Sequence, residues 1–434
     1  MIRQIDLRRK PLSKSEYAAL LPRASMDVAS AIKLVEPILA RVKSGDESEL
    51  IKLATEFDGV TPKKIKVAKS EIESALNKLD PQLKNSLQIS IERVRKVHRE
   101  QTRDEQITKV VEGGQVTQRW IPVDRVGLYV PAGGAIYPSS VIMNVVPAQI
   151  AKVKSIAIAS PPQKSNGGLP DPLILATCAL LGVDEIYAVG GAQAIALFAY
   201  GVKDLCDKCD LVTGPGNIYV AAAKRALRGV IGIDSEAGPT EIAIIADESA
   251  DAAEVASDLI SQAEHDSLAA SILITTSQRL ITEVKEQLAV RVKATLHSER
   301  IEKALTSIQS AIVLVDSISQ AIDVANAYAA EHLEIQTKNA RSDSELIRNA
   351  GAVFIGPNSP VSLGDYSAGS NHVLPTGGCA CHSSGLSVQT FLRSVQFIEY
   401  DKKALGDIAD TVITLANAEN LPAHGEAIKA RFEK

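Results

Sequence analysis

The sequence predicts an α/β protein with two incomplete, Rossmann-like, doubly wound parallel-sheet domains and small helical segments at both ends. Short apolar runs alternate with helical patterns four times between 125 and 235, and a second such series runs from 242 to 355. Apolar residues make up 45% of the chain and aromatic residues only 4%, which suits parallel sheets covered by helices. At 434 residues, the chain is too long for one compact core.

The first part of the chain is expected to be helical. Residues 1–25 are charged and contain Pro11 and Pro22, which indicates a small helical arm outside any core. Residues 27–119 carry apolar positions at three- and four-residue spacing, as amphipathic helices do. We expect this helical segment to pack with the later of the two sheets.

The strands of the earlier sheet are predicted at VGLYVP, SIAIAS, EIYAVGG, LVTGPGN and IGIDS. The strands of the later sheet are predicted at IAIIAD, SILITT, AIVLV, HLEIQT and AVFIG, with helices between successive strands. Residues 360–390 are rich in Gly and Ser and lack periodicity, so we expect a long loop that is functional or mobile. Residues 401–417 are helical again, and the polar tail ends in a short charged helix.

These elements predict four parts. They are a helical arm (1–25), a discontinuous first Rossmann-like domain (26–128 with 236–375), a second Rossmann-like domain (129–235) and a C-terminal segment (376–434).

Composition excludes several classes of function. The net charge is −5, which gives no electrostatic reason to expect binding to nucleic acid or to an anionic membrane. The first residues are basic with no apolar stretch behind them, so we expect no signal peptide, and no apolar run reaches bilayer length; a soluble, cytoplasmic protein is expected. Five cysteines argue against a disulfide framework, and the Cys206–Cys209 pair lacks a second pair that would complete a zinc site.

Glycine-rich turns follow three predicted strands, although the G-x-G-x-x-G fingerprint is absent. They lie at Tyr129–Gly134, Gly190–Gln193 and Gly214–Asn217, and helices follow them. Backbone N–H groups at helix starts hold phosphates, and parallel sheets bind ligands beyond the carboxyl ends of their strands. Together the turns indicate a dinucleotide edge, whereas each alone is explained by turn geometry.

Two polar pairs stand out in the later sheet. Gln262 and His265 are three residues apart, so they share a helix face that could ligate zinc or form a solvated helix end. Glu331 and His332 lie at a helix-to-strand junction, where they could act as an acid–base pair or as a capping pair.

The remaining candidates lie in loops and in the tail. Asp365 and His372 could contact metal or substrate, or belong to a mobile loop. Glu419 and His424 lie in the polar tail, where surface placement is the default. The other histidines are interpreted as non-functional: His98, His297 and His382.

Five linked motifs resemble the histidinol dehydrogenase family. They are GPGN-x-Y-V-x-x-A-K-R, D-x-x-A-G-P-T-E, S-Q-A-E-H, E-H-L-E-I and G-D-Y-x-A-G-x-N-H-x-L-P-T, in the family's order, and the similarity runs from about residue 28 to the tail. The resemblance implies a zinc enzyme that oxidises L-histidinol to L-histidine in two NAD-dependent steps, the last of histidine biosynthesis. It also implies a homodimer whose C-terminal segment crosses to the partner's active site.

The resemblance assigns a role to each candidate. Zinc ligands would be Gln262, His265 and Asp365 of one subunit with His424 of the other, and NAD would contact Tyr129, Gln193 and Asn217. Glu331 and His332 would be the acid–base pair. The substrate would meet the zinc ligands and His332, together with Thr240, His372 and Glu419.

The sequence departs from the family pattern at a few positions. Thr240 stands where Ser is usual, the loop at 161–171 is longer than typical, and Cys379 and Cys381 add two thiols near the predicted metal. Three alternatives stay open: a zinc hydrolase on a doubly wound scaffold, a non-catalytic NAD-binding protein, and a dehydrogenase of a different amino alcohol.

Overall fold

The computed structural model describes residues 2–24, 27–132, 135–236 and 238–433. These residues form two compact units: unit 1 comprises 1–101 and 124–391, and unit 2 comprises 102–123 and 392–434. Unit 1 contains two separate parallel sheets, which confirms the predicted fold class. In the described parts of the chain, no helix is both long and apolar enough to span a bilayer.

The earlier sheet of unit 1 has five parallel strands in the order β6-β5-β4-β7-β8. The first strand in sequence, β4, lies in the middle of the sheet. The next two strands, β5 and β6, extend the sheet on one side of it, and β7 and β8 extend it on the other. This order creates a switch point between β4 and β7, where ligands bind in open α/β sheets. The strands are β4 (Arg125–Tyr129), β5 (Ser155–Ser160), β6 (Ile186–Ala188), β7 (Leu211–Thr213) and β8 (Gly232–Ile233).

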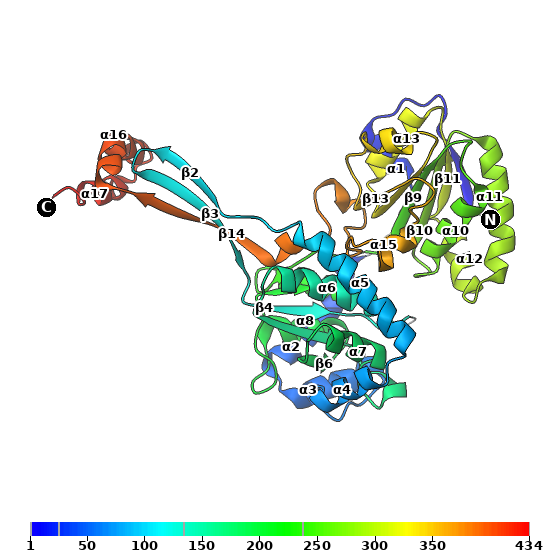
Figure 1. Ribbon diagram of the computed structural model, residues 1–434, viewed down its shortest axis with the longest axis horizontal. Helices are drawn as coiled ribbons and strands as arrows, with labels where there is room; N and C mark the ends of the chain where they lie inside the picture. The colour runs from blue at the N-terminus through cyan, green and yellow to red at the C-terminus, as the bar shows by residue number, and fades with distance from the viewer. Residues whose placement is uncertain (1, 25–26, 133–134, 237, 434) are drawn as a thin grey trace. The chain divides into compact units, whose positions relative to one another are not determined.

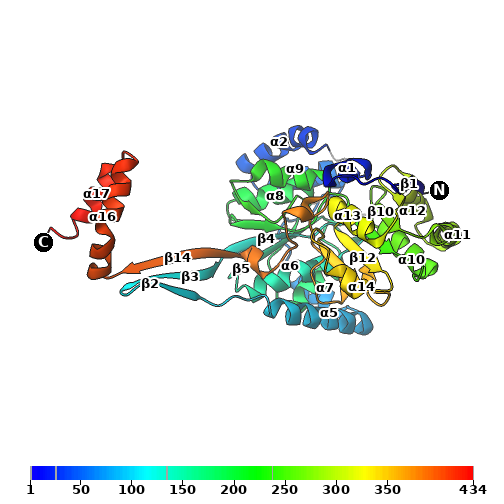
Figure 2. The ribbon, with the colours of Figure 1, turned by 90° about the horizontal axis from the view of Figure 1, so that it is seen from above.

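Helices cover both faces of this sheet, as Figure 2 shows. On one face α8 (Gly191–Tyr200) and α9 (Ile218–Leu227) pack with α2 (Val28–Ser44) in one apolar cluster. On the other face lie α6 (Pro138–Ile150) and α7 (Pro172–Leu180). They contact the remaining early helices, α5 (Pro81–Arg99) and α4 (Lys69–Asn77).

The expected placement of the early helices, 27–99, with the later sheet is wrong. The buried stripe of α2, which includes Val35 and Leu39, packs against α8 and α9. Alanines on α8 and α9 let α2 approach closely. The buried side chains of α2 thereby extend the apolar cluster of the earlier sheet. Two short elements connect α2 to α4: α3 (Glu47–Leu53) and the π-helical turn η1 (Ala54–Asp58).

The later sheet of unit 1 has six parallel strands in the order β1-β11-β10-β9-β12-β13. Figure 1 shows α10, α11 and α12 on one side of it and α1 and α13 on the other. Its strands are β1 (Arg3–Asp6), β9 (Glu241–Ala246), β10 (Ala270–Thr275), β11 (Ala311–Leu314), β12 (His332–Gln336) and β13 (Ala352–Ile355). Its helices are α1 (Lys14–Leu20), α10 (Ala252–Ala263), α11 (Gln278–Ala294), α12 (Ser298–Thr306), α13 (Ile318–Tyr328), α14 (Ala340–Ser344) and α15 (Val361–Tyr366).

The N-terminal segment is part of this sheet, so its predicted role as an arm outside the core is wrong. Arg3–Asp6 pairs in parallel with β11 as the edge strand. Leu7 and Tyr17 are buried in the apolar cluster beside α13. Short 3-10 turns complete unit 1: η2 (Lys164–Asn166), η3 (Cys379–Cys381) and η4 (Val388–Phe391).

Unit 2 is a three-stranded antiparallel sheet in the order β14-β3-β2, followed by two helices. The prediction of helix through residue 119 is therefore wrong after α5. The segment 106–122 is rich in β-branched residues, and Gly113 (φ 81°) provides the tight hairpin turn. The elements are β2 (Gln106–Val111), β3 (Gly114–Pro122), β14 (Leu392–Tyr400), α16 (Lys402–Ala418) and α17 (Pro422–Lys429).

Two carboxyl groups lie in the apolar layer between β12 and α10. Glu334 is fully buried, and Asp258 faces it from α10. The Gln336 amide donates to both, at 3.1 Å to Glu334 Oε1 and 3.2 Å to Asp258 Oδ2. Among the described residues, no lysine or arginine forms an ion pair with either. Burial and the neighbouring Asp258 raise the pKa of Glu334 well above its ordinary value.

Replacing Glu334 with glutamine is expected to flatten the fall in stability with rising pH. The folded chain keeps the Glu334 proton to a much higher pH than the unfolded chain, which loses it near 4.5. Between these values the folded state binds more protons, so stability falls as pH rises, by up to ~1.4 kcal/mol per pH unit. Relative to wild type, E334Q should gain stability as the pH rises from 6 to 8, by up to ~2.8 kcal/mol in urea unfolding.

The matched control is Glu286→Gln on the exposed face of α11, which should leave the pH slope unchanged. Equal slopes for E334Q and wild type would contradict a protonated Glu334.

Candidate functional site

The acid–base candidates lie at the amino end of β12, beside the amino end of β9. His332 is the first residue of β12 and pairs with Ile242 of β9. Ala329 ends α13 in the left-handed region (φ 49°), and the chain then turns into the strand through Glu331. Both side chains are buried. The structure thus places them at the opposite end of the strands from the usual ligand edge of parallel sheets.

Glu331 accepts hydrogen bonds from two groups at the start of β9. The Thr240 hydroxyl lies 2.5 Å from Glu331 Oε2, and the Glu241 N–H lies 3.0 Å from the same oxygen. Burial raises the pKa of Glu331 to about 8, although both hydrogen bonds oppose the rise. A carboxyl that titrates near neutral pH is suited to proton transfer.

His332 presents one ring nitrogen as a free base. Its Nδ1 lies 3.2 Å from the Glu241 carbonyl oxygen, which can only accept, so Nδ1 carries the hydrogen. Its Nε2 therefore has a lone pair, and it lacks a hydrogen-bond partner in the described part of the chain. Burial lowers the pKa of His332, which keeps the ring neutral and able to accept a proton.

Gln262, at the end of α10, joins this pair through Thr240. Its Nε2 donates to the Thr240 hydroxyl at 2.5 Å, and that hydroxyl donates in turn to Glu331. Gln262 is 1% exposed, and its Oε1 lacks a partner among the described residues. The orphaned oxygen fits a cation or a donor group that completes the site. The Thr240 hydroxyl therefore couples Gln262 to Glu331.

Asp365 and His265 adjoin the same pair. Asp365 Oδ1 lies 4.0 Å from His332 Nε2, and Asp365 Oδ2 lies 3.8 Å from His265 Nε2. Burial opposes the charged form of each group. Nevertheless, their mutual attraction raises the pKa of His265 and lowers that of Asp365. The Asp365 carboxylate thus lies between two imidazoles, and both this carboxylate and the His265 imidazole are groups that can bind zinc.

His372 follows α15 and faces the helices of the earlier sheet. Its Nδ1 lies 3.0 Å from the Asp365 carbonyl oxygen, and its Nε2 lies 3.4 Å from the Ser140 hydroxyl of α6. The long loop predicted at 360–390 thus begins with a helix and holds both Asp365 and His372 in fixed contacts.

Sequence reasoning missed an ion pair beside the acid–base pair, between the half-buried Arg23 and the buried Glu241. Arg23 donates to the Glu241 carboxylate at 2.5 and 2.7 Å, and its guanidinium stacks 3.9 Å from the Tyr328 ring centre. The Tyr328 hydroxyl donates to the same carboxylate at 3.2 Å. Glu241 is thereby held rigidly where its backbone binds Glu331 and His332. Arg23 lies in a segment without periodicity, so no sequence signal pointed to it.

The three glycine-rich turns meet at the carboxyl edge of the earlier sheet. The Tyr129 hydroxyl accepts from the Gly191 N–H at 3.1 Å, which joins the first two turns. A side chain at Gly214 (φ 115°) would collide with the Tyr129 carbonyl, so the third turn packs on the end of β4. Asn217 caps α9 by accepting from two backbone N–H groups. The predicted residues Gly133–Gly134 lie outside the described residues.

Gln193 has a half-buried acidic neighbour, Asp58, at the end of the η1 turn. The Gln193 amide donates to Asp58 at 3.4 Å, and burial raises the pKa of Asp58 to about 6. Tyr129 and Gln193 are both nearly fully buried. Their side chains therefore pack below the surface of this edge of the sheet, whereas Asn217 is exposed at the surface.

The remaining candidates are the two tail residues and the cysteines. Glu419 and His424 belong to unit 2, are exposed, and take no part in the contacts described above. All five cysteines are free, and Cys206 and Cys209 are buried. Cys379 and Cys381 form the short η3 turn that follows the His372 segment.

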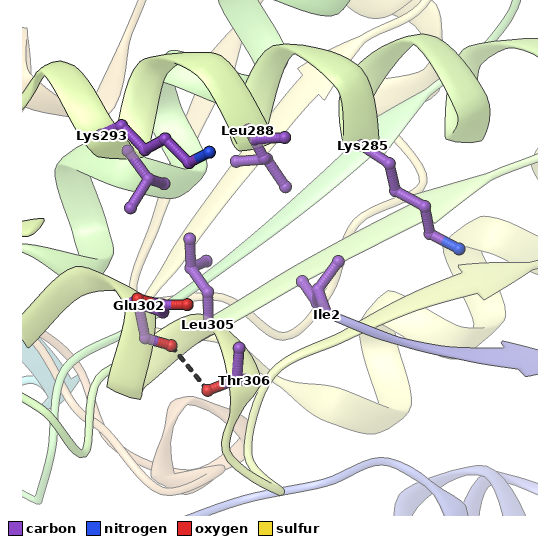
Figure 3. A pocket seen from close by; sticks show the side chains of 9 residues that line it. Ile2, Lys285, Leu288, Lys293, Glu302, Leu305 and Thr306 are labelled. Atoms are coloured by element: carbon purple, nitrogen blue, oxygen red, sulfur yellow. Dashed lines mark hydrogen bonds between the residues drawn. The ribbon is translucent and has the colours of Figure 1, made fainter. Parts of the chain in front are cut away.

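A half-open apolar cavity lies elsewhere, between α11, α12 and the edge strand β1 (Figure 3). Ile2, Leu288 and Leu305 form its apolar wall, and Lys285 and Lys293 lie at its rim. None of its lining residues belongs to the clusters described above.

Comparison with known proteins identifies the family. The family model for histidinol dehydrogenase matches residues 21–432. Histidinol dehydrogenase of Thermobifida fusca is 59% identical over 434 residues, covering 100% of this chain and 98% of that protein. The Mycobacterium tuberculosis histidinol dehydrogenase is 55% identical over 438 residues, covering 100% of this chain and 99% of that protein.

A solved structure agrees with these relatives. The crystal structure of histidinol dehydrogenase from Elizabethkingia anophelis superposes with a TM-score of 0.92 at 33% identity, covering 100% of this chain and 98% of that one. The chain therefore belongs to the histidinol dehydrogenase family.

Proposed function

We propose that this protein oxidises L-histidinol to L-histidine in two steps with two NAD, through an enzyme-held histidinaldehyde, as the last steps of histidine biosynthesis. This function rests on one observation in a chain of this family: the acid–base pair and the candidate metal ligands lie together at the amino ends of β9 and β12. There, the free Nε2 of His332 and the orphaned Oε1 of Gln262 adjoin a titratable Glu331. A cytoplasmic location would suit a biosynthetic enzyme that uses NAD.

The donor groups fit one zinc ion per subunit. Gln262, His265 and Asp365 would hold it with His424 of the partner subunit. Within the described residues, no three His, Cys, Asp or Glu side chains are grouped to hold a metal. The proposed set would not form such a group, because one ligand is an amide and another comes from a second chain. When bound, zinc would orient the substrate's nitrogen atoms and polarise its reacting oxygen.

NAD would bind at the carboxyl edge of the earlier sheet, in contact with Tyr129, Gln193 and Asn217. The switch point between β4 and β7 supports this placement. The N-terminus of α9 begins directly after the Gly214–Asn217 turn and offers N–H groups for the pyrophosphate.

The side chains of the site would move protons in a fixed order. His332 Nε2 would accept the hydroxyl proton of the alcohol while the carbon that bears this hydroxyl gives hydride to NAD, which leaves the aldehyde. Glu331, once ionised, would take a proton from the water that adds to the aldehyde carbon. His332 would return its proton to the aldehyde oxygen, so that the hydrate forms and Nε2 is again a free base. His332 then takes a second proton as the hydrate gives hydride to another NAD. Thr240 and His372 would line the substrate pocket, with Glu419 from the C-terminal segment. Retaining the aldehyde avoids release of a reactive intermediate.

Chelation is expected to abolish turnover reversibly. The metal-loaded protein should yield two NADH per histidine from histidinol, lose this activity after chelation and regain it with added zinc. Metal content before and after is measured by elemental analysis. A fully stripped protein that retains its rate would refute the zinc requirement, and a loaded protein that yields no NADH would refute the function. Saturable NAD binding separates this enzyme from a zinc hydrolase.

We further propose a homodimer in which the C-terminal segment completes the partner's site. Unit 2 exposes several large apolar side chains on its strands and on α16: Ile107, Val110, Phe397, Ile398 and Leu415. Such a surface on so small a unit favours burial against a second copy.

Mixing two inactive variants is expected to restore activity if the site is shared. In a heterodimer of H332N and His424→Asn subunits, one of the two sites would contain neither substitution. Random exchange of subunits should therefore recover about a quarter of wild-type activity. No recovery in mixtures whose subunit exchange is verified would place His424 in the site of its own subunit.

A further inference from the structure

The loop that follows α15 is attached to α5 at several points, although the two are far apart in sequence. The Ser90 hydroxyl donates to the Tyr366 carbonyl, and Arg93 Nη1 donates to the Ser367 carbonyl at 3.0 Å. Gly369 adopts φ 97°, and a side chain there would approach the Arg93 carbonyl to 2.8 Å. These contacts direct the loop along α5 toward its last turn.

His98 in that last turn is fully buried, although charged residues flank it in the sequence. Its Nδ1 lies 2.8 Å from the Val94 carbonyl oxygen, which can only accept a hydrogen bond. The ring hydrogen is therefore on Nδ1, and Nε2 carries a lone pair. Burial lowers the pKa of His98, so this neutral tautomer persists at neutral pH.

Asn371 makes three side-chain hydrogen bonds at this point, with both of its N–H groups and its oxygen engaged. Its Nδ2 donates to the Met143 carbonyl of α6 at 2.7 Å and lies 3.4 Å from His98 Nε2. Its Oδ1 accepts from the Val373 N–H at 2.9 Å. Only this orientation of the amide satisfies all three neighbours, because a flipped amide would place its oxygen against the carbonyl of Met143.

His372 lies between Asn371 and Val373, so the same bonds fix its backbone. Its ring then spans from the Asp365 carbonyl to the Ser140 hydroxyl of α6. α5 packs on α6, as Figure 1 shows, so both sides of this anchor belong to the helices of the earlier sheet. The lone pair of His98 thus contacts Asn371, the residue directly before His372. The proposed function places the His372 side chain in the substrate pocket.

We infer that His98 is a positioning residue for histidinol binding, acting through Asn371 on His372. The inference rests on the proposed role of His372. Loss of the His98 acceptor leaves an Asn371 hydrogen unpaired in a buried place, which costs about 1–3 kcal/mol. The amide is then held by two bonds instead of three, so the 371–373 backbone is less firmly fixed and His372 is displaced. Glu331 and His332 lie on another element and keep their geometry.

Two variants of His98 separate positioning from general damage. Asparagine reaches the position of Nδ1 but not that of Nε2, whereas glutamine carries an acceptor to the position of Nε2. H98N should raise the KM for histidinol about tenfold and change kcat less than about threefold. H98Q should return KM to within about twofold of wild type. Ser86→Ala, on the exposed face of α5, is the control and should match wild type.

A double-mutant cycle tests whether the effect passes through His372. If it does, H98N adds no further increase in KM once His372→Asn is present. An equal increase in both backgrounds, or no increase in either, overturns the inference. A KM unchanged by H372N alone refutes the substrate role of His372 and the inference with it, while retained turnover leaves the proposed activity intact. If H98N fails to fold, N371D replaces it, because aspartate cannot donate to His98.

Discussion

Replacing His332 with asparagine is expected to lower the rates of both half-reactions by about 10²- to 10⁴-fold. Asparagine can still donate to the Glu241 carbonyl, as Nδ1 does now, so the buried end of the side chain keeps its partner. It lacks the Nε2 lone pair, which is the free base of the site. Since no other neutral imidazole nitrogen occupies that position, neither the alcohol proton nor the hydrate proton has an acceptor.

The two half-reactions are measured separately, by supplying histidinol in one assay and histidinaldehyde in the other. The KM for histidinol should change little, because the loss is confined to proton transfer. The matched control is His297→Asn at the start of α12, outside the site, which should leave both rates unchanged. A full rate in either half-reaction of H332N would remove His332 from that step.

The parallel sheets were predictable because their strands are short apolar runs separated by clear helical patterns. Sequence reasoning failed where a decision depended on a distant partner. The stripe of α2 is equally suited to either sheet, and only the small residues of α8 and α9 decide between them. Likewise, Arg3–Asp6 is charged and has no strand periodicity, yet it pairs with the otherwise free edge of β11. The 106–122 hairpin did carry a local signal, in its β-branched residues and Gly113.

The site shows the same division. Motifs identified the groups that do chemistry, because Glu331, His332 and Asp365 stand in characteristic sequence contexts. The groups that hold them, such as Arg23 and His98, come from unrelated positions and lack a local pattern. Their roles arise from burial next to a specific acceptor, which is a property of the fold. The same holds for the turns of the earlier sheet, where glycines are visible in the sequence but their supports are not.

One such support is the buried Lys224, and replacing it with methionine is expected to destabilise the protein by about 3–5 kcal/mol. Lys224 is 2% exposed and lies 2.6 Å from the Asp234 carboxylate, which is also buried. The ammonium group donates to the Gly214 carbonyl at 2.5 Å, while Asp234 accepts from the Gly214 N–H at 2.8 Å. Methionine has a similar length but no charge, so it leaves Asp234 buried without a cation.

Urea unfolding compares K224M with Arg225→Met on the next residue. Arg225 pairs with Glu236 at the surface, so its loss should cost less than about 1 kcal/mol. Adding Asp234→Leu to K224M should recover part of the stability, because it removes the uncompensated charge. The turn itself should stay loosened in the double variant, since both clamps on Gly214 are gone. We therefore expect the KM for NAD to remain raised even where stability returns. If K224M and R225M lost equal amounts of unfolding free energy, the Lys224–Asp234 pair would not stabilise the turn.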